Sequence, residues 1–196
     1  PEVTMKLRYN SFSADHGIAY SQEARSRLRA MMGDRARLDV LLDGGEIFQL
    51  ADDWAVEILH APGHSHGHVA IWDPKHRTAI IGDAMLWQYI PTVEGRPALP
   101  PSYMYVDDYV STIRLIKELK PELLLTAHYP NMKHEQSEKF LEESLEFVRE
   151  TDRLILKALK ASGQSLTLKE LISRIGPELT PVPEEARMDL AFPFVG

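Results

Sequence analysis

Cysteine is absent from the 196 residues of the sequence. Its absence excludes disulfide bonds, a catalytic thiol and a cysteine-ligated zinc site in this chain. The sequence also has no apolar run approaching the roughly 18 residues that a membrane-spanning helix needs, so we expect no membrane partner. Any bound metal ion would have to be held by histidine, aspartate or glutamate side chains.

Basic side chains are in the minority. The chain carries 22 lysine and arginine residues against 29 aspartate and glutamate residues, which gives a net charge of −7. This balance argues against a broad nucleic-acid surface. The expected partner is a small-molecule substrate. The first residues lack the features of a secretory signal, so we expect a cytoplasmic protein.

The distribution of apolar residues predicts a mixed α/β fold. Short apolar runs separated by turn residues indicate an antiparallel meander, and one further strand follows later in the chain. These strands are expected at 46–50, 54–60, 68–73, 78–83 and 122–127. Apolar residues at helical spacing predict helices at 22–32, 107–120, 134–160 and 168–175. We expect Gly176-Pro177 to end the last helix and the proline-rich segment 90–102 to be a long loop.

Three side chains that can bind metal ions stand at the ends of predicted strands. His64 lies in the turn P-G-H-S-H-G-H, Asp83 ends the run I-I-G-D-A, and His128 lies in T-A-H-Y-P. Because adjacent strands present their end loops along one edge of a sheet, the fold can bring these residues together. Imidazole and carboxylate donors suit zinc, manganese or iron rather than calcium or magnesium. A carboxylate can also bridge two such ions.

Taken together, these motifs resemble the metallo-β-lactamase-fold hydrolase superfamily, and in particular its glyoxalase II-like and β-lactamase-like 2 branch, over about residues 40 to 150. The resemblance implies a four-layer αββα sandwich. It also implies that His64 is a ligand of a first zinc ion, that His128 is a ligand of a second, and that Asp83 bridges the two. Manganese or iron would be compatible with the same ligands.

By the same resemblance, residues 1–150 form the C-terminal portion of a metallo-β-lactamase-like domain, and residues 151–196 begin a small helical, winged-helix-like region. The first motif of the family, H-x-H-x-D-H, does not occur, and Asp15-His16 lacks the preceding histidines. We expect the N-terminal half of the fold to be missing from this chain, the alternative being that the metal site is lost. Half of a two-sheet sandwich would expose an apolar face, which we expect further residues or a partner, such as a second copy in a homodimer, to cover.

Other side chains near these motifs are expected to have supporting roles. His68 is expected to steady the turn behind the metal ligands through its ring nitrogens. His66 is expected to face solvent or substrate, whereas His60 and His76 are expected to be structural or surface groups. The candidates for lining a substrate pocket are Trp87, Tyr89, Tyr103 and Tyr105, which lie in or beside the proline-rich segment.

Two functions are consistent with these patterns. The first is a metal-dependent hydrolase in which a metal-bound hydroxide attacks an ester, thioester, lactone or phosphodiester, so that no side chain is assigned as the nucleophile. A mononuclear iron oxygenase on the same scaffold is a variant of this site. The second is a non-catalytic or degenerate member of the fold with a binding or regulatory role, which the missing H-x-H-x-D-H motif favours. The presence of three intact ligands on strand ends favours the hydrolase.

Overall fold

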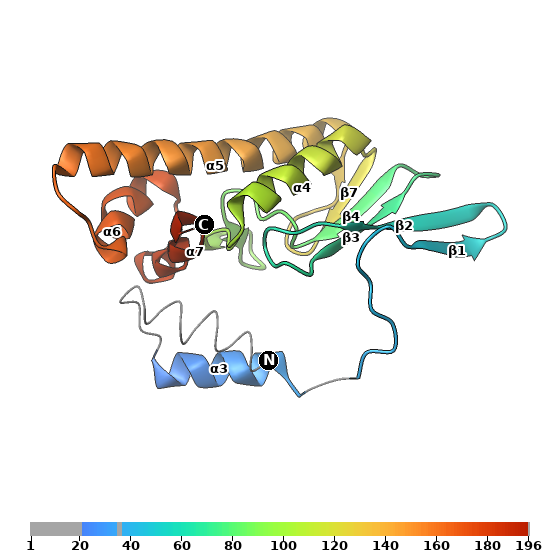
Figure 1. Ribbon diagram of the computed structural model, residues 1–196, viewed down its shortest axis with the longest axis horizontal. Coiled ribbons are helices and arrows are strands. Elements are labelled where there is room, and N and C mark those ends of the chain that lie inside the picture. The colour runs from blue at the N-terminus through green and yellow to red at the C-terminus, as the bar shows by residue number, and fades with distance from the viewer. Residues whose placement is uncertain (1–20, 35–36, 196) are drawn as a thin grey trace.

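The computed structural model describes residues 21–34 and 37–195 of the chain. Asp15-His16 therefore lies outside the described residues. Within the described ranges, no helix is long and apolar enough to cross a membrane. The helix predicted at 22–32 is confirmed as α3 (Gln22–Met32), which Figure 1 shows apart from the sheet.

A six-stranded sheet forms the centre of the mixed α/β fold. Its strand order is β1-β2-β3-β4-β7-β8, and all neighbours are antiparallel except β4 and β7. The strands are β1 (Ile47–Ala51), β2 (Trp54–His60), β3 (Val69–Asp73), β4 (Thr78–Gly82), β7 (Leu123–Thr126) and β8 (Met132–Lys133). The predicted meander and the later strand are thus confirmed to within one residue at each end.

The proline-rich segment is more ordered than the sequence predicts. Instead of one long loop, it contains the two-stranded ribbon β5 (Ile90–Pro91) and β6 (Pro97–Leu99). Thr92 closes the turn between them, because its amide donates to Arg96 O over 2.7 Å and its carbonyl accepts from Gly95 N over 2.9 Å. A turn at Gly95, which has a positive φ of 80°, lets the chain reverse within a few residues.

Helix α4 (Val106–Leu119) connects the parallel strands β4 and β7. Parallel neighbours need such a crossover, since a tight turn can join only antiparallel strands. The crossover places the C-terminal ends of β4 and β7 at the same edge of the sheet, where Ala127 N donates to Gly82 O over 3.1 Å. Asp83 and His128 directly follow these two positions.

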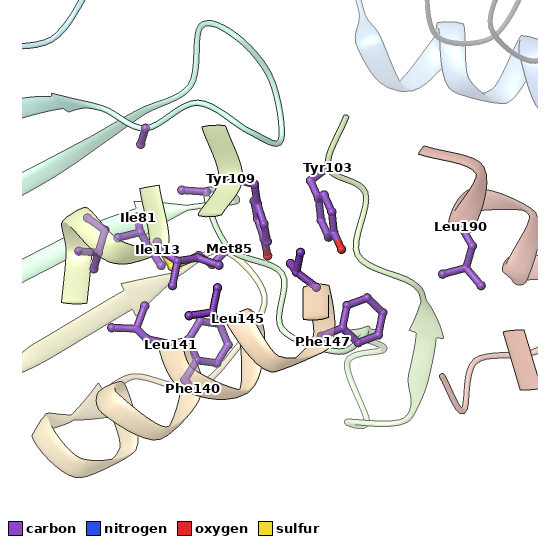
Figure 2. Packing of buried hydrophobic residues seen from close by; sticks show 14 of the residues in the cluster. Ile81, Met85, Tyr103, Tyr109, Ile113, Phe140, Leu141, Leu145, Phe147 and Leu190 are labelled. Carbon is purple, nitrogen blue, oxygen red and sulfur yellow. The ribbon is translucent and has the colours of Figure 1, made fainter. Parts of the chain in front are cut away.

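Helices cover one face of the sheet. In Figure 1, α4 and the long helix α5 (His134–Ser162) lie together over it. Ala79 and Leu124 are register neighbours on this face and have no exposed surface. Figure 2 shows part of the same core, in which Ile81 and Met85 lie near Ile113 of α4.

The opposite face of the sheet is partly open to solvent. Ile80 is 43% exposed although it pairs with Ile71 on one side and Leu125 on the other. Phe48 of the edge strand β1 is 41% exposed. The described residues therefore leave an apolar sheet face uncovered, as half of a two-sheet sandwich would. Whether a second copy or further residues cover it stays a prediction.

The C-terminal segment consists of α6 (Leu168–Leu179), the 3₁₀ helix η2 (Glu184–Leu190) and α7 (Ala191–Val195). Helices α6 and α7 pack on α5, and η2 packs on α6. The predicted end of α6 at Gly176-Pro177 is wrong, because the helix continues to Leu179. Pro177 lies in the last turn, where it removes one backbone hydrogen bond without ending the helix. A side chain at Gly176 would come within 3.1 Å of Arg187 in η2. The glycine therefore makes room for η2 rather than ending the helix.

The predicted division of the chain at residue 150 falls inside α5, which runs through it without interruption. One hydrophobic cluster includes Ile113 and Leu141 before this point and Ile172 and Leu190 after it. The division into residues 1–150 and 151–196 stays a prediction.

Candidate functional site

The loop between β2 and β3 is held tightly against α4. Thr112 Oγ1 donates to Pro62 O over 2.7 Å, and Ala61 N donates to His68 O over 2.8 Å across the base of the loop. Gly63 has a φ of 129°, and a Cβ at this position would lie 2.5 Å from Tyr109 Cα. Glycine is thus required here for two reasons, the backbone conformation and the close approach of the helix.

His64 is oriented by a backbone carbonyl. Its Nδ1 atom lies 2.6 Å from Ser102 O. A carbonyl oxygen only accepts, so Nδ1 carries a proton, and in the neutral ring Nε2 carries the lone pair that a metal ion requires. Metal-binding histidines typically donate their second ring nitrogen in this way. Gly63 O accepts from Met104 N and Tyr105 N, at 3.0 and 3.2 Å, and ties the two loops together.

Asp83 and His128 meet at the shared end of β4 and β7. Asp83 Oδ1 lies 3.0 Å from His128 Nε2, and the two side chains are 37% and 40% exposed. The Oδ1 atom itself is buried and has no hydrogen-bond partner among the described residues. The two atoms are therefore close, but Asp83 Oδ1 receives no hydrogen bond from His128 or from any other described residue.

His68 lies between the loop of His64 and the end of β4. Its ring is nearly perpendicular to that of His64, with centroids 6.2 Å apart, and a Cβ at Gly82 would lie 3.5 Å from it. Burial, and secondarily the nearby His64, lower the pKa of His68, while Asp83 opposes the shift. Its Nδ1 is buried without a hydrogen-bond partner in the described part of the chain. Within the described residues no hydrogen bond from Nδ1 supports the predicted steadying of the turn by the ring nitrogens, which stays a prediction.

These donors fit part of a metal centre. Asp83 and His128 supply an unpaired oxygen and a nitrogen at one point, and His64 has the ring orientation of a ligand. Across residues 21–34 and 37–195, however, no three histidine, cysteine, aspartate or glutamate side chains form a group that could hold an ion by themselves. The described residues thus form no complete metal site by themselves, and the ligand roles of His64, Asp83 and His128 stay predictions.

The aromatic candidates divide into core and surface residues. Tyr103 is only 1% exposed and stacks on Tyr109 with ring centroids 4.2 Å apart, and burial raises its pKa. This corrects the expectation that Tyr103 lines a substrate pocket, because its ring is enclosed in the core (Figure 2). Trp87 and Tyr89 are half-buried and pack on each other at 5.0 Å.

Tyr105 stays at the surface of the site. It is half-buried and stacks on the exposed ring of His66 with centroids 3.5 Å apart. The carbonyl of His66 lies 2.7 Å from His60 Nε2, which is consistent with a structural role for His60. His76 binds Asp73 in the β3–β4 turn and is likewise structural.

Sequence reasoning missed the tyrosines that fasten the segment after Asp83. The hydroxyl of Tyr129 lies 2.5 Å from Leu86 O and 2.8 Å from Tyr89 O and donates its proton between them. The hydroxyl of Tyr109 accepts from Leu86 N over 3.0 Å. The one signal in the sequence was the position of Tyr129 directly after His128.

Comparison with known proteins identifies the fold. The profile of the metallo-beta-lactamase superfamily matches residues 6–128, so the match begins upstream of the residues that carry the motifs. A metallo-beta-lactamase family protein from Thermus thermophilus aligns with a TM-score of 0.61 at 20% identity. The alignment covers 99% of this chain and 56% of the Thermus protein. A beta-lactamase domain protein from Burkholderia ambifaria has a TM-score of 0.61 at 14% identity, over 93% of this chain and 52% of its own.

A third match is more distant. The stereoselective inverting sec-alkylsulfatase Pisa1 from Pseudomonas sp. has a TM-score of 0.52 at 14% identity, over 80% of this chain and 26% of its own. At such identities the structural matches establish the fold alone. The chain spans about half the length of the Thermus and Burkholderia proteins. No curated protein matches it.

Proposed function

The chain belongs to the metallo-β-lactamase superfamily, and from this premise we propose that it forms part of a metal-dependent hydrolase acting on an ester, thioester, lactone or phosphodiester. Members of this superfamily are generally metal-dependent hydrolases. Because the chain spans about half the length of the related structures, the activity proposed is that of the whole protein. The expected substrate is a small molecule, and the protein is proposed to be cytoplasmic and to act as a homodimer.

The contact between Asp83 and His128 is the observation that carries this proposal. A buried carboxylate oxygen without a hydrogen bond costs free energy, about 1–3 kcal/mol even for a neutral group and more for a charged one. Here that oxygen lies 3.0 Å from Nε2 of His128, which follows the neighbouring parallel strand β7. A cation bound between the two groups would offset this cost. A purely structural Asp–His pair would instead be expected to form a well-aligned hydrogen bond.

The residues of this chain would each contribute one function. Asp83 and His128 would hold the ion at the end of β4 and β7, with Asp83 as a bridge if two ions bind. His64, fixed by Ser102 O, would add a ligand from the loop after β2. When bound, zinc, manganese or iron supplies Lewis acidity and an activated water, so that hydrolysis needs no serine or cysteine nucleophile. The remaining ligands are proposed to come from residues beyond those described.

A second candidate function is a non-catalytic module with a binding or regulatory role. The specific observation in its favour is that the described residues contain no group of three side chains able to hold an ion. The absence of H-x-H-x-D-H from the sequence points the same way. Against it stand the orientation of His64 and the unpaired oxygen of Asp83.

Metal analysis of the full-length protein separates the two functions. We expect the purified protein to retain at least one zinc, manganese or iron ion per chain and to hydrolyse members of a panel of thioesters, lactones and phosphodiesters. Asp83→Asn should lower both metal content and hydrolysis, the latter by more than about 100-fold. His134→Gln, on an exposed histidine at the start of α5, serves as the matched control and should change neither. A metal-free wild-type protein without hydrolytic activity would favour the non-catalytic module.

A further inference from the structure

The segment that follows Asp83 has no strand partner to hold it. Residues 84–89 connect β4 to the ribbon of β5 and β6 and have no regular structure. They are fastened instead by side chains from other elements. Tyr129 donates to Leu86 O and Tyr89 O, at 2.5 and 2.8 Å, and Tyr109 accepts from Leu86 N. The indole of Trp87 donates to Glu143 of α5 over 2.9 Å.

Tyr129 is itself firmly placed. Its amide donates to Thr126 Oγ1 over 3.1 Å, which anchors it to the end of β7. Its ring packs edge-on against Phe140 of α5 with centroids 5.0 Å apart. These two contacts hold Tyr129 at the end of β7 and against α5.

Hydrogen bonds join the segments that carry Asp83 and His128 on both sides of these residues, and the Tyr129 hydroxyl makes the second of these connections. On one side, Ala127 N donates to Gly82 O over 3.1 Å and joins the two segments of the chain just before Asp83 and His128. On the other side, the Tyr129 hydroxyl joins them again just beyond these residues. The Asp83–His128 contact lies between the two connections. A shift of either backbone segment relative to the other would therefore stretch one of these hydrogen bonds.

We propose that Tyr129 is a positioning residue for the metal centre, because its hydroxyl fixes the segment from Leu86 to Tyr89 relative to His128 and so sets the separation of Asp83 from His128. The inference rests on the proposed function, since it assigns these two side chains to a bound ion. Both are more than one-third exposed and so receive little restraint from packing. Ligands must be held within about 0.5 Å of their productive geometry to bind an ion well, and the hydroxyl supplies this restraint.

The test compares two single substitutions in the full-length protein. Tyr129→Phe removes the hydroxyl but keeps the ring and its packing. Thr180→Val is the matched control, because Thr180 Oγ1 also donates to this segment, to Gln88 O over 3.3 Å, but comes from the C-terminal region rather than from the residue beside His128. Zinc affinity is measured by competition with a chelator, and the ligand field is measured from the visible absorption of the cobalt-substituted protein.

We expect Tyr129→Phe to weaken zinc binding by about 10- to 100-fold and to change the cobalt spectrum, while Thr180→Val leaves both as in the wild type. Hydrogen exchange should become faster at residues 84–89 in Tyr129→Phe. The proposal is overturned if Tyr129→Phe keeps wild-type zinc affinity and spectrum, or if Thr180→Val weakens binding to the same extent. A wild-type protein that binds neither metal would overturn the proposed function and this inference with it, whereas wild-type binding unaffected by Tyr129→Phe would overturn the inference alone.

Discussion

The Nε2 atom of His128 lies 3.0 Å from Oδ1 of Asp83, although a helix and a two-stranded ribbon separate the two residues in the sequence. The parallel pairing of β4 with β7 creates this proximity, since each residue follows the C-terminal end of one of the two strands. The site thus depends on long-range strand pairing and on the tight packing of the loops around it.

Gly63→Ala should strongly destabilise the protein. Its φ of 129° is costly for any residue with a side chain, and a Cβ would lie 2.5 Å from Tyr109 Cα. We expect the free energy of unfolding to fall by about 2–4 kcal/mol, measured by urea denaturation. Gly67→Ala in the same loop is the control, because a Cβ there meets nothing within 4 Å. Equal stability of the two variants would contradict the packing of the His64 loop against α4.

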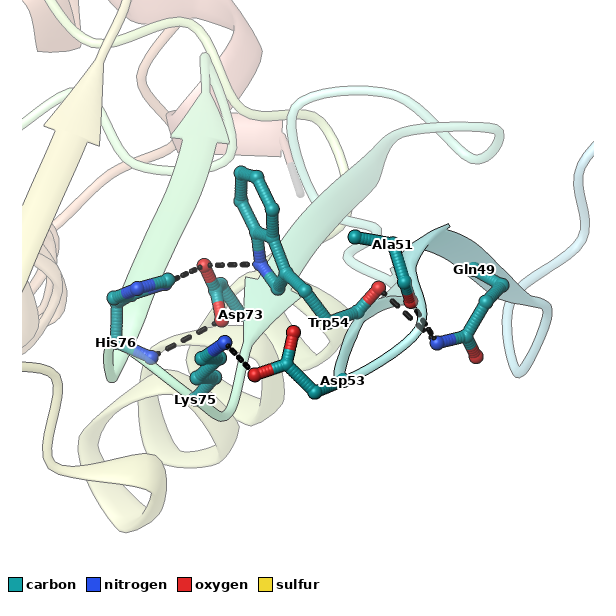
Figure 3. Close-up of polar contacts among 7 residues, drawn as sticks. All are labelled: Gln49, Ala51, Asp53, Trp54, Asp73, Lys75 and His76. Carbon is teal, nitrogen blue, oxygen red and sulfur yellow. Dashed lines mark hydrogen bonds and ion pairs between the residues drawn. The ribbon is translucent and has the colours of Figure 1, made fainter.

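Asp73→Asn should make the free energy of unfolding less dependent on pH in the acid range. Figure 3 shows the carboxylate of Asp73 accepting from the indole of Trp54 (2.9 Å) and from the ring of His76 (2.7 Å). Burial alone would raise the pKa of Asp73, but the hydrogen bonds from His76 and Trp54 outweigh it and hold the pKa below its ordinary value of 3.8. The ionised carboxylate therefore stabilises the fold fully above that value, and the contribution is lost as the pH falls through the folded-state pKa.

We accordingly expect Asp73→Asn to lower the free energy of unfolding by about 1–3 kcal/mol at pH 7, and the difference from the wild type to shrink as the pH is lowered below about 4. Denaturation curves at several pH values measure this. Asp53→Asn removes only an exposed ion pair with Lys75 and should have almost no effect at any pH. A constant deficit for Asp73→Asn across the pH range would count against the assigned pKa shift.

Tyr103→Ala should mainly lower stability, whereas Tyr105→Ala should mainly affect substrate binding. Tyr103 is enclosed in the core, so its truncation should cost about 3–5 kcal/mol of stability. Tyr105 stacks only on the exposed His66 at the surface of the site, so its truncation should cost much less and should raise KM for a hydrolysed substrate with little change in kcat. Thermal unfolding and steady-state kinetics distinguish the two. Severe unfolding of Tyr105→Ala with unchanged KM in the remaining folded protein would show that Tyr105 is structural.

Ile80→Lys should reduce self-association if a second copy covers the open sheet face. Ile80 is 43% exposed in a central strand, where a lysine would place a charge on any apolar interface. Sedimentation velocity should show a shift from dimer to monomer. Val93→Lys, at a fully exposed turn position between β5 and β6, is the control and should leave the dimer intact. A wild-type protein that is monomeric at all concentrations would exclude the homodimer.

The sequence predicts those features that depend on local periodicity and turn residues. The strands from Ile47 to Gly82 and the helices α3, α4 and α5 follow directly from apolar spacing and from glycine and proline positions. The meeting of Asp83 with His128 follows from one further rule, that neighbouring strands present their ends at a common edge. The profile of one superfamily covers the stretch of sequence that contains His64, Asp83 and His128.

Features that depend on which side chains meet across the fold could not be predicted. An aromatic residue in a proline-rich segment has the same local pattern whether it faces substrate or, like Tyr103, stacks inside the core. Gly176-Pro177 has the composition of a helix end, but the approach of η2 determines its role. The hydroxyl of Tyr129 meets its acceptors, Leu86 O and Tyr89 O, across about 40 residues of sequence, so its position beside His128 does not reveal which groups it binds.

The crossover through α4 also determines when the site can exist. During synthesis, Asp83 leaves the ribosome before His128, because it comes 45 residues earlier in the chain. The Asp83 carboxylate can therefore contact His128 only after β7 has paired with β4. Proximity of these two side chains is consequently a mark of completed chain assembly rather than of local structure.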